Sequence, residues 1–288
     1  MERLKGRRKA MWYVLIGVII LFATIVVFFK LPFSKTKMEF NKAVGNKIAS
    51  ANELSEVFTE EDIMNLPEPV QKYFKRCGYI GTAKMNYMKA EFENVDFKMS
   101  AEKTIRIDYT QYNFVNKPDR FAFIDSDLYG IPFEGFDSYN DGVGSMKGNF
   151  AKLITLFDQR GEEMDKACLV TYLAESLMVP SAALKDFIVW EEIDETHAKA
   201  TIKYYGISAS GIFTFNEDGL WLSFKTSDRV ATSMDGTKRD ADWSAIIEDY
   251  QDVNGLLLPR VVKSIWHYPE GDFVYFNEND THVNFEFY

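Results

Sequence analysis

The sequence predicts an N-terminal transmembrane helix followed by an α+β domain, in which one large antiparallel sheet packs with a few helices. Three observations predict this fold: an uncharged apolar run at residues 11–29, apolar–polar alternation with a period of two from residue 84 onward, and a helical block at residues 162–178. No repeat of about 20–50 residues recurs, and no low-complexity linker interrupts the chain. We therefore expect residues 59–288 to form one domain.

The apolar run, which begins at Met11 and ends at Phe29, predicts an anchor in the lipid bilayer. As a helix it extends about 28 Å, close to the roughly 30 Å of a bilayer's hydrocarbon core. Residues 1–10 hold five Lys or Arg and one Glu. This excess of cations predicts a cytoplasmic N-terminus and a domain outside the cell membrane. A cleaved signal peptide is the alternative, but its apolar core is shorter and ends in small residues, unlike residues 30–34.

Residues 30–58 are predicted to form a polar, helix-prone stalk. The apolar spacing through Phe40 and Val44 is helical but thin, which leaves a helical spacer and a docking arm as alternatives. Thr59 followed by three acidic residues predicts the start of a short helix. A second helix is expected near residues 69–77, since Pro69 suits a first turn and Gly78 suits a helix end.

The rest of the domain is predicted to be an antiparallel meander. Alternating runs at residues 104–109, 120–124, 198–204 and 211–215 are typical of strands with one buried face. Turn signals separate such runs, among them Asp141-Gly142, Asp218-Gly219 and Asn254-Gly255. The helical block at residues 162–178 interrupts the strands, so we expect one sheet to curl around or against a helix.

Composition limits the classes of function. Net charge is −10, and because residues 1–10 contribute +4 the remainder carries −14, which argues against nucleic acid as a partner. Aromatic residues make up 15% of the chain, which favours strands and a large apolar interior or groove. The two cysteines, Cys77 and Cys168, are compatible with either a disulfide or two buried free thiols.

The sequence predicts no metal site and no cofactor. Among the histidines, His197, His267 and His282, no two are three or four residues apart. Residues 137–142 resemble the start of a calcium loop, but Tyr139 and Gly148 stand where oxygen ligands are required, so a hairpin turn is expected. Residues 206–211 resemble a nucleophile elbow, but they lie between two predicted strands rather than between a strand and a helix.

Glu175 is the most informative single residue, because it lies within an otherwise apolar stretch at residues 173–178. A buried carboxylate needs a partner or becomes neutral. Glu175 is therefore expected either to bind a ligand head group or act as an acid, or to form an internal salt bridge, with Arg160 or Arg229 as candidate partners.

Three stretches resemble an uncharacterised family of bacterial single-span membrane-anchored proteins: residues 66–74 (LPEPVQKYF), residues 172–184 (YLAE to PSAAL) and residues 190–194 (WEEID). The resemblance covers nearly all of the predicted domain and implies no catalytic residues, since that family has no assigned activity. The strand–helix–strand order is also similar to the half-barrel of periplasmic lipoprotein carriers. That similarity implies a curved sheet with an apolar concave face closed by helices.

Three functions remain open. The first is a module that binds a lipid or another apolar ligand; its candidate contacts are Glu175, Phe121, Phe123, Phe213, Phe215, Trp221 and Phe224. The second is a structural or partner-binding domain of an envelope complex, and the third is an extracytoplasmic hydrolase, with Glu175 and an Asp as acid and base. An apolar cavity of about 300 Å³ or more favours the first, a filled interior the second, and a wet cleft with paired carboxylates the third.

Overall fold

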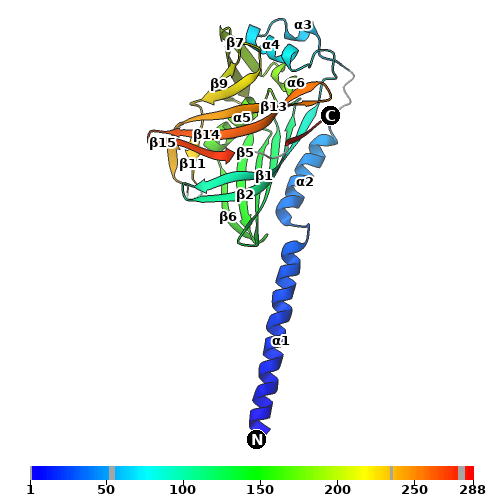
Figure 1. Cartoon of the computed structure of the whole chain (residues 1–288), viewed down its shortest axis with the longest axis vertical. Coiled ribbons are helices and arrows are strands. Elements are labelled where there is room, and N and C mark those ends of the chain that lie inside the picture. The colour runs from blue at the N-terminus through cyan, green and yellow to red at the C-terminus, as the bar shows by residue number, and fades with distance from the viewer. Residues whose placement is uncertain (1, 52–55, 234–235, 278–282) are drawn as a thin grey trace.

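The computed structural model describes residues 2–51, 56–233, 236–277 and 283–288. Its longest helix, α1 (Glu2–Lys30), projects as a straight rod from one end of a β-rich domain (Figure 1). Within the described ranges, one helical stretch is long and apolar enough to cross a membrane, and it includes residues 7–30 of this rod. Apolar side chains from Met11 to Phe22 are exposed on all sides of the helix, which is typical of contact with lipid.

Helices α2, α3 and α4 follow α1 and precede the first strand. Helix α2 (Lys35–Ile48) begins at Ser34, whose side chain accepts a hydrogen bond from the Lys37 amide. Helix α2 packs against the sheet through Phe40 and Val44, so this part of the predicted stalk lies on the domain. Helix α3 (Glu60–Ile63) carries a capping box formed by Thr59 and Asp62. Helix α4 (Glu68–Arg76) has a proline in its first turn.

The predicted antiparallel sheet is confirmed. Among the described residues it contains fourteen strands, in the order β6-β5-β4-β3-β2-β1-β15-β14-β13-β10-β9-β8-β7, with β16 also paired to β1, and every pair is antiparallel. In chain order the strands are β1 (Tyr87–Ser100), β2 (Lys103–Phe114), β3 (Arg120–Leu128), β4 (Ile131–Asn140), β5 (Val143–Phe150), β6 (Ile154–Arg160), β7 (Ile188–Asp194), β8 (His197–Tyr204), β9 (Ile207–Phe215), β10 (Trp221–Thr226), β13 (Asp242–Val253), β14 (Leu256–Tyr268), β15 (Gly271–Asn277) and β16 (Val283–Phe287).

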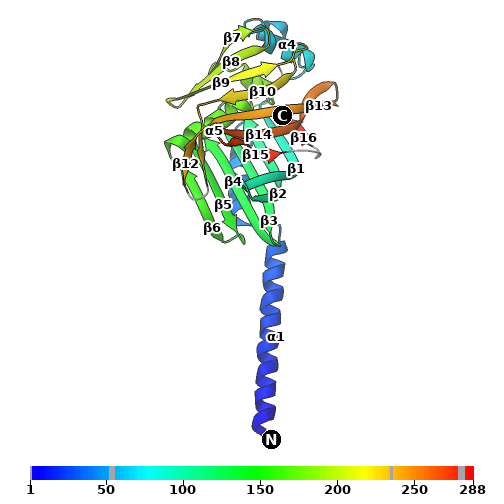
Figure 2. The same ribbon diagram turned by 60° about the vertical axis from the view of Figure 1, so that its left-hand side comes forward.

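The sheet curls, and helix α5 (Glu162–Ala174) bridges its two ends. Helix α5 packs against β4, β5 and β6 at one end of the sheet and against β8 and β9 near the other (Figure 2). The Tyr205 hydroxyl, in the β8–β9 turn, donates to Asp141 in the β4–β5 turn at 3.0 Å, so the two ends of the sheet also meet directly. The short helix α6 (Pro180–Ala183) follows α5. The curled sheet and α5 together enclose an interior on the concave side.

The two faces of the sheet have different covers. Helix α2 lies on the outer face of β3 and β4, whereas α5 lies on the concave face. A separate two-stranded ribbon, β11 (Val230–Thr232) and β12 (Lys238–Asp240), follows β10. The Gln159 amide at the β6 edge donates to the Ser233 carbonyl at 2.9 Å, and Lys238 pairs with Glu163 at the start of α5. The ribbon is thus held against the open side of the curl by exposed polar contacts.

The cysteines are free thiols. Cys77 and Cys168 are both buried and form no disulfide. Burial raises the pKa of the Cys77 thiol to about 12, so this thiol is protonated at neutral pH.

Candidate ligand-binding cavity

A cavity of about 540 Å³ lies between the concave face of the sheet and α5. Its volume falls within the range of roughly 300–1,000 Å³ that is typical of small-molecule sites. Many of the residues that line it are aromatic or methionine, among them Phe97, Met146, Phe157, Trp221, Trp243 and Trp266. The residues that line it come from both arms of the curled sheet, from α5 and from the β11–β12 ribbon.

Strand periodicity decides which side chains reach the cavity. On β2, Tyr109 and Gln111 line the cavity, and on β3, Arg120 and Ile124 do so. Residues two apart on a strand share one face of the sheet. The same alternation sends Phe121 and Phe123 to the outer face, where they pack with Phe40 of α2.

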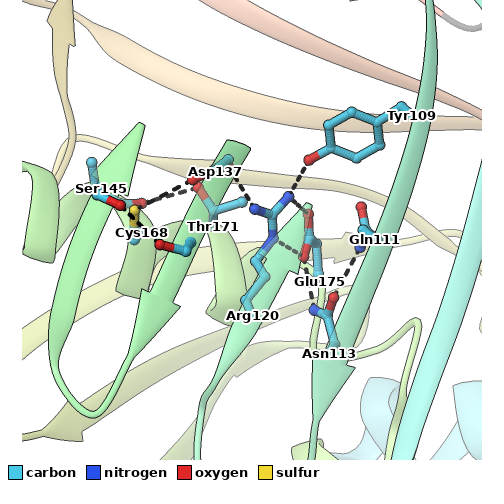
Figure 3. Close-up of polar contacts among 11 residues, drawn as sticks. Tyr109, Gln111, Asn113, Arg120, Asp137, Ser145, Cys168, Thr171 and Glu175 are labelled. Atoms are coloured by element: carbon cyan, nitrogen blue, oxygen red, sulfur yellow. Dashed lines mark hydrogen bonds and ion pairs between the residues drawn. The ribbon is translucent and has the colours of Figure 1, made fainter. Parts of the chain in front are cut away.

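A buried polar cluster interrupts the apolar wall, and Arg120 is at its centre (Figure 3). Arg120 is 3% exposed and holds Glu175 with two bonds, Nε to Oε2 at 2.7 Å and Nη2 to Oε1 at 3.0 Å. Its Nη1 donates to Asp137 at 2.6 Å, and its Nη2 also donates to the Tyr109 hydroxyl at 2.5 Å. Asn113 adds a third bond to Glu175, at 2.8 Å. Every oxygen of Glu175 therefore accepts a hydrogen bond.

The fold explains why Glu175 needs this partner. Glu175 is the C-cap of α5, and the C-terminal end of a helix carries partial negative charge, which disfavours a carboxylate. The bidentate contact with Arg120 compensates for that position. The sequence-based candidates for the cationic partner, Arg160 and Arg229, were wrong: Arg160 pairs with Asp158 at the rim, and Arg229 forms no ion pair among the described residues.

Burial and charge shift the acid–base properties of the cluster. Burial lowers the pKa of Arg120, but the electrostatic interactions with Glu175, Tyr109 and Asp137 raise this pKa by more, so that it lies well above its usual value. Burial raises the pKa of Tyr109 and of Cys168. Cys168 donates to the second oxygen of Asp137 at 3.7 Å. The cluster is thus a closed set of ionic hydrogen bonds around a permanent cation.

Arg229 is a second cation on the cavity wall, in a different setting. Its guanidinium carbon lies 4.6 Å from the ring centre of Trp243 and 5.4 Å from that of Trp266. The two tryptophans are directly opposed across β13 and β14. The Trp243 indole donates to the Tyr275 hydroxyl at 3.1 Å, which fixes the ring under the guanidinium.

The seven predicted site residues lie in three places. Glu175 and Trp221 line the cavity. Phe213, Phe215 and Phe224 are almost completely buried in the main core behind the wall, where the Phe213 ring lies 4.8 Å from that of Phe224 and 5.8 Å from that of Trp221. Phe121 and Phe123 belong to the cluster under α2 on the opposite face.

Sequence reasoning missed Arg120, Trp243 and Trp266, and it treated Arg229 only as a candidate salt-bridge partner. Arg120 could have been found from the alternating run. It lies two residues from Ala122 and four from Ile124 and so shares their face of the strand, which places a charge on a buried face. No comparable signal distinguishes the two tryptophans, because their meeting depends on the pairing of β13 with β14.

Within the described ranges, no group of three or more His, Cys, Asp and Glu side chains is placed to hold a metal ion. His197 contacts Asp194, and His267 contacts Ser244 and Asp272. His282 lies outside the described residues. Asp141, in the turn that resembles a calcium loop, instead contacts Lys47 and Lys117.

Fold and cavity together define a curled antiparallel-sheet protein with an internal apolar cavity and a single long apolar helix at its N-terminus. The chain belongs to DUF6544, a family of unknown function whose match covers residues 56–278. This match confirms the predicted membership of an uncharacterised family. No curated protein matches the chain.

The solved structures that are similar to this chain include the following two. One is a LolA superfamily protein from Nitrosomonas europaea, with 9% sequence identity and a TM-score of 0.38 over 74% of this chain and 92% of that one. The other is a DUF1329 family protein from Desulfovibrio piger, with 12% identity and a TM-score of 0.38 over 76% and 92% of the two chains.

Proposed function

We propose that this protein binds a lipid or another molecule with an apolar chain in the cavity between the concave face and α5. One observation carries the proposal: a cavity of about 540 Å³ with walls of aromatic and methionine side chains. A filled core leaves few voids larger than a water molecule. A hollow of this size in an apolar wall favours occupation by a ligand, because empty apolar cavities cost stability.

We further propose that α1 anchors the protein in the cell membrane, with residues 1–10 in the cytoplasm and the domain outside. The cationic flank supports this orientation. The Lys152 side chain, in the β5–β6 turn, donates to the Leu31 carbonyl at 2.5 Å, directly after α1. The anchor thus meets the end of the sheet near β6, close to the membrane from which a lipid ligand would come.

The polar cluster favours binding over hydrolysis as the role of this site. Both oxygens of Glu175 and both oxygens of Asp137 accept hydrogen bonds from neighbouring side chains. A general base needs a carboxylate within hydrogen-bond reach of a substrate proton. Here Arg120 donates hydrogen bonds to both Glu175 and Asp137, so the two acids behave as partners in a structural ion pair of the cavity wall.

Quenching of tryptophan fluorescence by a brominated lipid tests the proposal, because bromine quenches indole only on close approach. Three tryptophans, Trp221, Trp243 and Trp266, line the cavity, whereas Trp190 does not. The experiment uses the full chain with the substitution Trp12→Phe, because Trp12 is exposed on α1. In phosphatidylcholine nanodiscs, methyl dibromostearate, an uncharged ester, is expected to quench this protein saturably.

A matched pair of variants on one strand gives the control. Ala245 lines the cavity, and Ile246, the next residue along β13, is half-buried and belongs to the other face of the strand. Ala245→Phe fills the cavity and is expected to weaken binding of the ester at least about 10-fold, a loss of roughly 1.4 kcal/mol. Ile246→Phe is expected to leave the affinity for the ester unchanged. Absence of saturable quenching in the unsubstituted cavity would overturn the proposal and favour a partner-binding domain.

A further inference from the structure

The cavity wall contains unsatisfied hydrogen-bond donors. Among the described residues that line it, two side-chain atoms are buried without a hydrogen-bond partner: Nε1 of Trp221 and Nη1 of Arg229. Both are donors that cannot accept. A buried polar group without a partner costs about 1–3 kcal/mol, and more when it is charged. What this wall lacks is therefore an acceptor.

The acids that line the cavity are already paired. Asp137 and Glu175 are bound to Arg120, and at the rim Asp158 pairs with Arg160 at 2.9 Å. Glu163, also at the rim, pairs with Lys238. Even Asp228, the neighbour of Arg229 in the chain, accepts from Lys166 at 2.6 Å and from the Ser210 amide at 2.8 Å. In the part of the chain that the structure describes, no carboxylate lies within ion-pair distance of Arg229.

The position of Arg229 suits an anionic ligand. Its guanidinium lies over the opposed rings of Trp243 and Trp266, which hold a cation by their quadrupoles without using its N–H groups. The edges of the planar guanidinium remain available for two parallel hydrogen bonds to a carboxylate or a phosphate. Aromatic rings flank this cation in the cavity wall, so an anionic group bound there brings an apolar chain into the same cavity.

From these contacts we propose that Arg229 binds the anionic group, a carboxylate or a phosphate, of an amphiphile whose apolar chain fills the cavity. This inference rests on the proposed function and adds the charge of the ligand to it. Trp221 offers a second, neutral donor on the same wall. The Arg120 cluster does not share this role, because its guanidinium is occupied by Glu175, Asp137 and Tyr109.

The test compares two probes with the same brominated chain, one with a charged end group and one with a neutral end group. Dibromostearate carries a carboxylate, and its methyl ester does not. Both are titrated into the full chain with Trp12→Phe in phosphatidylcholine nanodiscs, and the ratio of their half-quenching concentrations is compared between variants. Both probes partition into the same bilayer in every sample, so a change in the ratio reports the protein site.

Arg229→Leu is expected to reduce the preference for the stearate over the ester by about 10–100-fold, the range for a charge-assisted hydrogen bond. Binding of the ester is expected to persist, which shows that the variant is folded. Arg160→Leu is the matched control, since Arg160 also lines the cavity but is 59% exposed in its side chain and paired with Asp158. It is expected to keep the preference.

Each outcome separates the two proposals. One outcome is that the ratio of the two half-quenching concentrations is the same in the parent protein and in the Arg229→Leu variant. That result would overturn the inference about the anion and leave the cavity proposal standing. If neither probe quenches saturably, both are overturned. Inorganic phosphate is added as a third arm: if it displaces the stearate at equal concentration, the site binds a free anion, and the amphiphile is overturned.

Discussion

The two faces of β2, β3 and β4 carry similar aromatic residues but reach different degrees of packing. On the outer face, Phe121 and Phe123 pack against Phe40 of α2, with ring centres of Phe40 and Phe123 5.6 Å apart. On the concave face, Tyr109 and Phe133 line a hollow of about 540 Å³. Aromatic content alone therefore does not indicate whether a face is filled or hollow.

The covering helix makes the difference. Helix α2 lies directly on the outer face and inserts Phe40 and Val44 between the rings. Helix α5 instead bridges the two ends of the sheet, from β5 to β9, and so stands away from the middle strands. A helix that spans a curled sheet leaves space beneath it that side chains of ordinary size do not fill, and this space is the cavity.

The largest expected effect separates the filled face from the hollow one. Phe121→Ala removes a ring that is 2% exposed and is expected to lower the free energy of unfolding by about 3–5 kcal/mol. Phe157→Ala removes a half-buried ring beside a hollow and is expected to cost about 1 kcal/mol. Guanidinium unfolding of the full chain in nanodiscs measures both; equal losses would show that the concave face is packed like the outer one.

A smaller effect is expected from the polar cluster in the hollow face. Glu175→Gln keeps the shape of the side chain but removes the charge that Arg120 binds, and it is expected to cost about 1.5–3 kcal/mol. Glu163→Gln is the control at the rim, where an exposed pair with Lys238 contributes less than about 1 kcal/mol. If the two variants lose the same stability, the cluster is solvated and the cavity wall is more open than the structure shows.

Local patterns were sufficient to predict the class of fold. Period-two runs and Asp-Gly or Asn-Gly turns predicted the antiparallel sheet, and the apolar run at residues 11–29 predicted the long apolar helix. The site was only partly predictable. The isolated charge of Glu175 in an apolar stretch pointed to the cavity, but its partner Arg120 comes from a strand more than fifty residues earlier. Which face of a strand is hollow depends on the covering helix, and that information lies in tertiary packing.

The smallest expected effect concerns the contact that joins α2 to the ends of the sheet. Asp141 accepts from Lys117 at 2.8 Å and from Tyr205, and it lies 3.4 Å from Lys47 of α2. The hydrogen bond from Lys117, with that from Tyr205 and the charge of Lys47, lowers the pKa of Asp141 from 3.8 to about 2. A carboxyl whose pKa is lower in the folded state stabilises the fold above its ordinary pKa, and this stabilisation is lost as the pH falls from about 4 to 2.

Asp141→Asn is therefore expected to cost about 0.5–1 kcal/mol at neutral pH, a value reduced for the exposure of this group to solvent. The difference from the parent protein should shrink as the pH falls below about 4 and be small near pH 2. Lys117→Met is the matched variant: it removes the principal donor, and combined with Asp141→Asn it should add little, because the two side chains share one interaction. Urea unfolding between pH 2 and pH 7 measures the effect. A stability difference that persists unchanged at pH 2 would mean that Asp141 acts through packing of the turn rather than through its charge, and that the closure of the sheet ends does not depend on these ion pairs.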